Sequence, residues 1–155
     1  MFDLSAISVA LHAVAAVVWV GGMFFAYAVL RPALTMFEPP QRLALLNAVF
    51  ERFFVFVWII VIALPATGYL LVFRLFGGFA GAEAYIHVMH MVALVMIGLF
   101  VFLYFVPYRH FRAAVAAQKW PVAAEHLNTI RRIIGINTIL GLVTVIIGAS
   151  GRYWA

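Results

Sequence analysis

The sequence predicts an all-α membrane protein, an antiparallel bundle of four transmembrane helices with a cytoplasmic surface helix between the third and fourth spans. Composition and the lengths of the apolar stretches carry this prediction. Of the 155 residues, 68% are hydrophobic and 10% are charged, and the mean hydropathy is +1.14. An ordinary soluble domain is roughly 45–50% apolar and about 25% charged, so this chain could not cover a soluble globule with polar surface. A soluble enzyme is therefore excluded.

Four apolar stretches are long enough to cross a bilayer, for which about 20 mostly apolar residues are needed. They are residues 5–30, 53–73, 85–106 and 133–149. The first connection is expected to carry a short helix over residues 43–50. Residues 108–132 are polar enough for a surface helix or a helical pair, broken at Pro121. Because the spans take up most of the chain, residues 1–155 are expected to form a single membrane domain.

The basic residues predict the orientation in the membrane. Eight of the ten Lys and Arg residues lie in the connections after the first and third spans, whereas the opposite side has only Arg74 and Arg152. Under the positive-inside rule, those two connections face the cytoplasm and both termini face outward. The net charge of +5 therefore reports topology, and nucleic acid is not an expected partner. The first apolar stretch runs about 25 residues, beyond the roughly 7–15 of a signal-peptide core, so no cleavable signal is expected.

The chain has no Cys, which excludes disulfides, iron–sulfur clusters and thiolate metal sites, so His, Met, carboxylate or backbone groups must hold any metal. By the predicted topology, His12, His87 and His90 all fall in the outward half of the bilayer. Ionisable residues at membrane depth are costly and mark functional sites, although imidazoles there also hydrogen-bond across helices as packing elements. His110 and His126 lie in a basic connection and are expected to be solvated surface residues.

Helical geometry places His12 on one face of the first span together with Ala15, Ala16, Trp19 and Gly22. Small residues on such a face indicate close helix packing. The large ring of Trp19 beside a candidate ligand favours instead a flat macrocycle held between the first and third spans. The sequence leaves both interpretations open.

The third span contains the run His87-Val88-Met89-His90. His87 and His90 are three residues apart and can face the same partner helix, while Met89 is expected to point away from both. Imidazole and thioether ligands suit copper, with the thioether favouring Cu(I), so this cluster could form a copper site completed by His12. One histidine from each of two helices in a four-helix bundle is also an arrangement that holds a b-type haem, as is a His–Met pair.

A family resemblance rests on these residues. The stretch from His12 through Arg31-Pro32, with Trp19 and then Gly21-Gly22-Met23-Phe24-Phe25, resembles the first span of small membrane proteins of the copper-resistance D (CopD) type. It is also similar to the HemJ-type protoporphyrinogen oxidases. Ile86-His87-Val88-Met89 is similar to a Leu-His-Val-Lys motif of the HemJ type, and residues 132–137 are weakly similar to the start of that family's last span.

The resemblance implies a bacterial inner-membrane protein with periplasmic termini, in which His12 and His87 are haem ligands. Met89 stands where the HemJ motif has Lys, which counts against protoporphyrinogen oxidase activity. The CopD type implies a role in copper resistance, and the residues do not decide between copper and haem.

The leading hypothesis is a b-type haem near the outward face, held axially by His12 and by His87 or His90. The protein would transfer single electrons, with quinone or another membrane-soluble molecule as its redox partner. Trp19 is expected to lie beside the haem. Arg152 lies at the same outward level, either as an interface anchor or as a partner of the haem propionates.

Two alternatives remain. One is a copper-binding or copper-transport protein of the CopD type, with His12, His87, His90 and Met89 as ligands. The other is a structural bundle or membrane-partner subunit whose histidines only pack. Neither the substrate nor the oligomeric state follows from the sequence.

Overall fold

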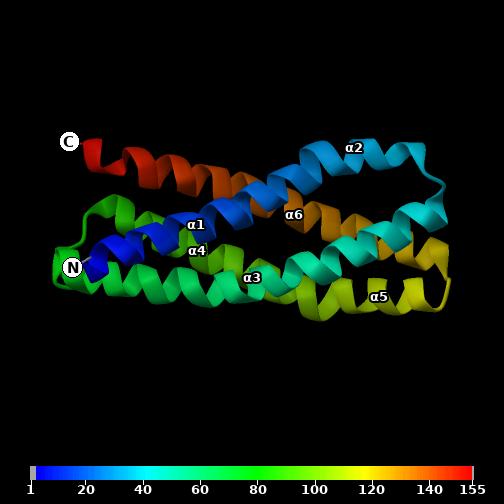
Figure 1. The fold of residues 1–155 in the computed structure, drawn as a ribbon, viewed down its shortest axis with the longest axis horizontal. Coiled ribbons are helices and arrows are strands. Elements are labelled where there is room, and N and C mark those ends of the chain that lie inside the picture. The colour runs from blue at the N-terminus through cyan, green and yellow to red at the C-terminus, as the bar shows by residue number, and fades with distance from the viewer. Residues whose placement is uncertain (1–2, 155) are drawn as a thin grey trace.

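The structure, a computed structural model that describes residues 3–154, consists of four long helical rods packed antiparallel (Figure 1). The rods are Leu4–Met36, Pro39–Phe76, Ala84–Ala116 and Trp120–Tyr153, and each is long and apolar enough to cross a membrane. No strand occurs among the described residues. The predicted fold class, an all-α bundle of four transmembrane helices, is confirmed.

Each rod is built from one or more helical segments. The first consists of α1 (Leu4–Phe24), a π-helical segment (Phe25–Leu30), α2 (Arg31–Ala33) and a 3-10 turn (Leu34–Met36). The second is α3 (Pro39–Phe76), followed by a 3-10 turn (Phe79–Gly81). The third joins α4 (Ala84–Leu103) through a π-helical segment (Tyr104–Tyr108) to α5 (Arg109–Ala116). The fourth is α6 (Trp120–Ser150) with a final 3-10 turn (Gly151–Tyr153).

The helices extend beyond the apolar stretches that predicted them. The expected short helix over residues 43–50 and the second span form one helix, which begins at Pro39 because proline is well tolerated at the first helical positions. The polar segment 108–132 forms a helical pair, as predicted, but its arms, α5 and the start of α6, continue the third and fourth rods. The chain reverses at residues 117–119, and Pro121 lies in the first turn of α6.

The helix ends are defined by local hydrogen bonds. At the start of α1, the Asp3 carboxylate accepts a hydrogen bond from the Ser5 N–H at 3.1 Å and lies 3.7 Å from the Arg74 guanidinium of α3. At the end of α3, Gly77 adopts a φ of 67° and donates its N–H to the Val72 carbonyl. Glycine suits this left-handed conformation, which other residues disfavour. The Asp3–Arg74 contact also ties the start of the first rod to the end of the second.

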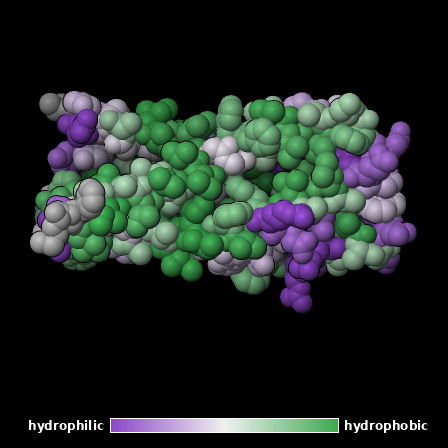
Figure 2. Space-filling view, in the orientation of Figure 1, coloured by the Kyte–Doolittle hydropathy of each residue, from purple (hydrophilic) through white to green (hydrophobic). Residues whose placement is uncertain are grey.

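The termini and the α3–α4 turn lie at one end of the bundle, and the α2–α3 and α5–α6 connections lie at the other (Figure 1). Close backbone contacts join α1 to α3 and α6, and α4 to α6. On the face that Figure 2 shows, hydrophobic side chains cover the middle, while hydrophilic ones gather toward the ends, most of them at the end with the α5–α6 connection. This distribution suits a bilayer around the middle of the bundle. Which end faces the cytoplasm stays a prediction from the charges.

Aromatic rings fill the bundle interior toward the α5–α6 connection. The ring centroid of Phe54 lies 4.8 Å from that of Tyr108, edge to face. The ring of Trp58 lies 5.2 Å from those of both Phe100 and Tyr104. Aromatic pairs in this geometry add stability beyond the area that they bury. This end of the bundle is therefore densely packed.

Candidate cofactor cavity

At the opposite end, nearer the termini, the four rods enclose a cavity of about 440 Å³. Its size lies within the roughly 300–1,000 Å³ typical of ligand sites, and its lining is predominantly apolar, as in such sites. Every rod contributes small residues to the wall, which explains the free space. They are Ala13 and Ala16 of α1, Gly68 of α3, Ala93 of α4, and Gly141 and Gly148 of α6.

His12 reaches this cavity from α1 and is held by α3. Its Nδ1 donates a hydrogen bond to the Thr67 hydroxyl oxygen at 2.9 Å, and that hydroxyl donates its own proton to the Ala63 carbonyl at 2.7 Å. Because the hydroxyl proton is already engaged, the ring proton of His12 lies on Nδ1. The other nitrogen, Nε2, therefore keeps a free lone pair. A histidine whose second nitrogen is fixed in this way is the usual form of a metal ligand.

Gly68 makes room for the His12 ring. A Cβ at this position would lie 3.3 Å from Cε1 of His12, closer than ordinary van der Waals contact. Thr67 and Gly68 thus act on the same ring, one by holding it and the other by leaving space. Neither residue is among the site residues that the sequence predicts. The one available signal was a hydroxyl residue inside an apolar span, close to Pro65.

On α4, the structure distinguishes the two histidines. His90 lines the cavity and is partly buried, with its ring 5.5 Å from that of Tyr69 and 5.1 Å from that of Phe79. His87 is exposed, does not line the cavity and has its ring 5.9 Å from that of Phe79. His12 and His90, rather than His12 and His87, therefore reach the same space.

Met89 also lines this cavity, but its side chain ends against α6, whereas the His90 ring lies beside Tyr69 and Phe79, so the two side chains reach different parts of the wall. The cavity is wide, so side chains from adjacent positions of α4 both line it, although they leave the helix in different directions. Gly148 of α6 accommodates the end of the Met89 side chain, since a Cβ there would lie 2.9 Å from the Met89 methyl carbon. A second thioether, that of Met96, lines the cavity and is 3% exposed.

Trp19 and Arg152 occupy very different places. Trp19 is 3% exposed and lines the cavity, and its ring meets that of Phe100 edge to face at 6.5 Å. It therefore lies where the cavity borders the aromatic interior. Arg152 is exposed and is not among the lining residues. Its guanidinium donates a hydrogen bond to the Tyr153 hydroxyl at 2.7 Å, and its role as an interface anchor or as a partner of haem propionates stays a prediction.

The histidines at the other end pack against each other. The rings of His110 in α5 and His126 in α6 stack at a centroid distance of 5.2 Å. Nδ1 of His110 donates a hydrogen bond to the Val106 carbonyl at 2.7 Å. His110 is exposed and His126 is partly buried, so the expectation of a solvated surface residue fits His110 better than His126.

The donor set limits what the cavity can hold. Nowhere between residues 3 and 154 do three or more His, Cys, Asp or Glu side chains come together in a metal-binding group. A metal ion here would have to combine His12 and His90 with methionine thioethers. A cofactor that carries its own donors would need only the two imidazoles.

Comparison with known proteins gives a family. Residues 47–150 match the family described as Copper resistance protein D. The match covers most of α3 and all of α4, α5 and α6, and so includes Thr67, Met89 and His90 but not His12. No curated protein and no solved structure matches the chain. The similarity to HemJ-type proteins stays a prediction. Since the match covers more than half of the chain, this membrane protein belongs to the Copper resistance protein D family.

Proposed function

We propose that the protein binds one b-type haem in this cavity, with His12 and His90 as axial ligands, and transfers single electrons within the membrane. The observation that carries the proposal is the state of His12. Thr67 holds its Nδ1–H at 2.9 Å, which leaves Nε2 free as a ligand atom on the wall of a large apolar cavity.

The residues present suit this cofactor. His12 and His90 come from different helices, which is the arrangement that holds haem in four-helix bundles. When bound, the haem would supply a one-electron couple, and the protein tunes such a couple through its ligands and through burial. Thr67 would fix the orientation and tautomer of His12. The apolar wall, closed on one side by Trp19, would exclude water from the site.

Spectroscopy tests this directly. The protein purified in detergent from membranes supplied with both iron and copper should show a Soret band and, after dithionite, a reduced α-band. His12→Ala and His90→Ala should each abolish or strongly change this spectrum. His87→Ala is the matched control, because it removes an imidazole from the same helix but outside the cavity, and it should leave the spectrum unchanged.

Three results would count against the proposal. A metal-loaded protein without either band would exclude haem. Loss of the bands in His87→Ala, with retention in His90→Ala, would keep the haem but overturn the choice of ligand. If all three histidine variants alter only stability and no cofactor is ever bound, the histidines are packing elements.

Copper is the second candidate, favoured by the family to which the chain belongs. The thioethers of Met89 and Met96 line the same cavity as His12 and His90, and thioether with imidazole suits Cu(I). This function predicts stoichiometric copper by elemental analysis, no porphyrin, and loss of copper in Met89→Leu. The haem function predicts that Met89→Leu keeps the cofactor, so one variant separates the two.

Several finer expectations belong to the same proposal. Quinone or another membrane-soluble molecule is the expected redox partner, in a bacterial inner membrane with the cavity toward the periplasm. Protoporphyrinogen oxidase activity is not expected, because Met89 replaces a Lys of the HemJ motif. Cysteine variants placed at Asp3 and Gln118, labelled from either side of intact cells, would test the orientation.

A further inference from the structure

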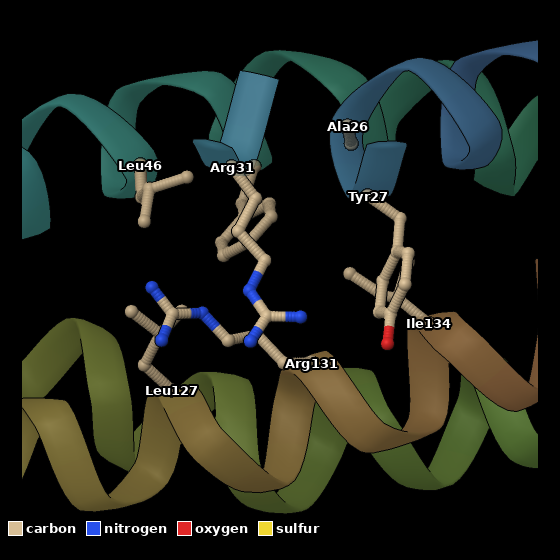
Figure 3. A pocket seen from close by; sticks show the side chains of 8 residues that line it. Ala26, Tyr27, Arg31, Leu46, Leu127, Arg131 and Ile134 are labelled. Atoms are coloured by element: carbon tan, nitrogen blue, oxygen red, sulfur yellow. The ribbon is translucent and has the colours of Figure 1, made fainter. Parts of the chain in front are cut away.

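A second, smaller space lies far from the cofactor cavity, where residues 26–31 of the first rod meet α3 and α6. Arg31 and Arg131 both line it, and its volume is about 20 Å³. Figure 3 shows their guanidinium groups side by side in the gap between the two helices. Arg42, from the start of α3, lies close enough to Arg131 to interact with it electrostatically, as does Arg31. Three rods thus bring three positive charges to one place.

No carboxylate neutralises these charges. Within residues 3–154 the ion pairs are Asp3–Arg74 and Glu51–Arg112, and neither involves the cluster. Like charges held together without a counter-charge repel each other, so this arrangement disfavours the folded state unless an anion binds.

The hydrogen-bonding state of the cluster indicates a missing acceptor. The Nε of Arg42 is buried and has no hydrogen-bond partner. Buried polar groups in native proteins almost always have a partner, so this unpaired Nε requires an explanation. Arg42 and Arg131 are partly buried, whereas Arg109, Arg112 and Arg132, from the same end of the bundle, are exposed. Two of the three cluster members therefore differ from the solvated basic residues around them, while Arg31 is exposed.

The surroundings of the cluster suit two kinds of anion. One is a headgroup attached to apolar lipid chains, and the other is a free ion small enough to enter from the surface. Tyr27 is 40% exposed, so the site reaches the exterior of the bundle, and the Arg31 guanidinium lies over its ring at 5.3 Å. Leu46 and Ile134 form apolar walls. Guanidinium forks bind phosphate oxygens in pairs, and basic pockets between transmembrane helices bind phosphate headgroups.

We propose that Arg31, Arg42 and Arg131 together bind a phosphate group, supplied either by an anionic lipid headgroup or by free phosphate. One phosphate oxygen would enter the small space and accept hydrogen bonds from the guanidinium groups of Arg31 and Arg131, which line it, while Arg42 would add its positive charge from α3. The site would link the first rod, α3 and α6 at the end of the bundle opposite the cofactor cavity. It does not depend on the function proposed for that cavity.

The test is a binding titration on the delipidated, detergent-purified protein, followed by native mass spectrometry. One arm adds phosphatidylglycerol, with phosphatidylcholine as the zwitterionic reference, and the other adds inorganic phosphate. Arg131→Gln should weaken binding by about tenfold to a hundredfold, as expected for the loss of one charge-assisted hydrogen bond. Arg132→Gln is the matched control, since it removes the same charge one residue away, and it should bind like the wild type.

The arms also identify the source of the phosphate. Binding of phosphatidylglycerol that depends on Arg131 assigns the site to a lipid, whereas binding of inorganic phosphate alone assigns it to the free ion. Equal losses in Arg131→Gln and Arg132→Gln, or no preference for phosphatidylglycerol over phosphatidylcholine together with no phosphate binding, would overturn the proposal. If Arg131→Gln does not fold, the exposed Arg31→Gln provides the same comparison.

Discussion

The hydrogen bond between His12 and Thr67 makes the sharpest prediction. Thr67→Val keeps the shape of the side chain but removes the oxygen that accepts the Nδ1–H at 2.9 Å. The ring proton of His12 then has no fixed position, and Nε2 is no longer held as the free ligand atom. Loss of such a partner of a metal-binding histidine costs about 10–100-fold in affinity, which corresponds to about 1.4–2.8 kcal/mol. We expect the affinity of the protein for haem to fall by this factor.

The assay is a haem titration of the apoprotein in detergent, followed by the Soret absorbance. Thr67→Ser, which keeps the hydroxyl, should bind like the wild type. Thr144→Val is the matched control, because Thr144 lines the cavity and its hydroxyl bonds only to the Leu140 carbonyl, at 2.8 Å. If Thr67→Val binds haem as tightly as Thr67→Ser, the assignment of the His12 ring as a positioned ligand is refuted.

Three further predictions concern packing in the bundle interior. Gly68→Ala should weaken haem binding, because its Cβ would lie 3.3 Å from the His12 ring and displace it, and the same titration measures the change. Phe54→Ala should lower the free energy of unfolding by about 3–5 kcal/mol, since its side chain is 3% exposed, whereas Phe56→Ala, at a position 57% exposed, should change it little in thermal melts in detergent. Asn137→Leu removes the hydrogen bond from Asn137 to the Met96 carbonyl and should change the free energy of unfolding by under about 1 kcal/mol. A hydrogen bond between membrane helices contributes about 0.6 kcal/mol, and the Asn137 Oδ1 is already without a partner. A loss of several kcal/mol would contradict this.

The sequence predicted the four spans well and their ends poorly, for a physical reason. Hydropathy reports which residues prefer the bilayer, whereas a helix continues for as long as its backbone hydrogen bonds do. The helix α3 therefore starts at Pro39, well before its apolar run at residue 53. Similarly, α5 continues the third rod past Pro107, because a π-helical segment accommodates that proline.

The candidate site was predictable in part. The periodicity of the first span placed His12 and Trp19 on one face, and both line the cavity. The spacing of three between His87 and His90 could not show which of them faces inward, since this depends on how α4 is rotated against α6. Thr67 escaped prediction because its role requires the register between α1 and α3, which no local pattern contains.

The division of the bundle interior into a dense aromatic end and an end with small residues has a consequence for how a ligand enters. Local opening requires least energy where side chains make few contacts, and here that is the wall formed by alanines and glycines. The aromatic end can keep the four rods assembled while the other end separates briefly toward the lipid. The protein is thus suited to folding first and loading its ligand laterally from the bilayer afterwards. Backbone amides of α1 near His12 should then exchange hydrogen faster than those of α3 near Phe54 in the apoprotein, and this difference should shrink once the ligand is bound.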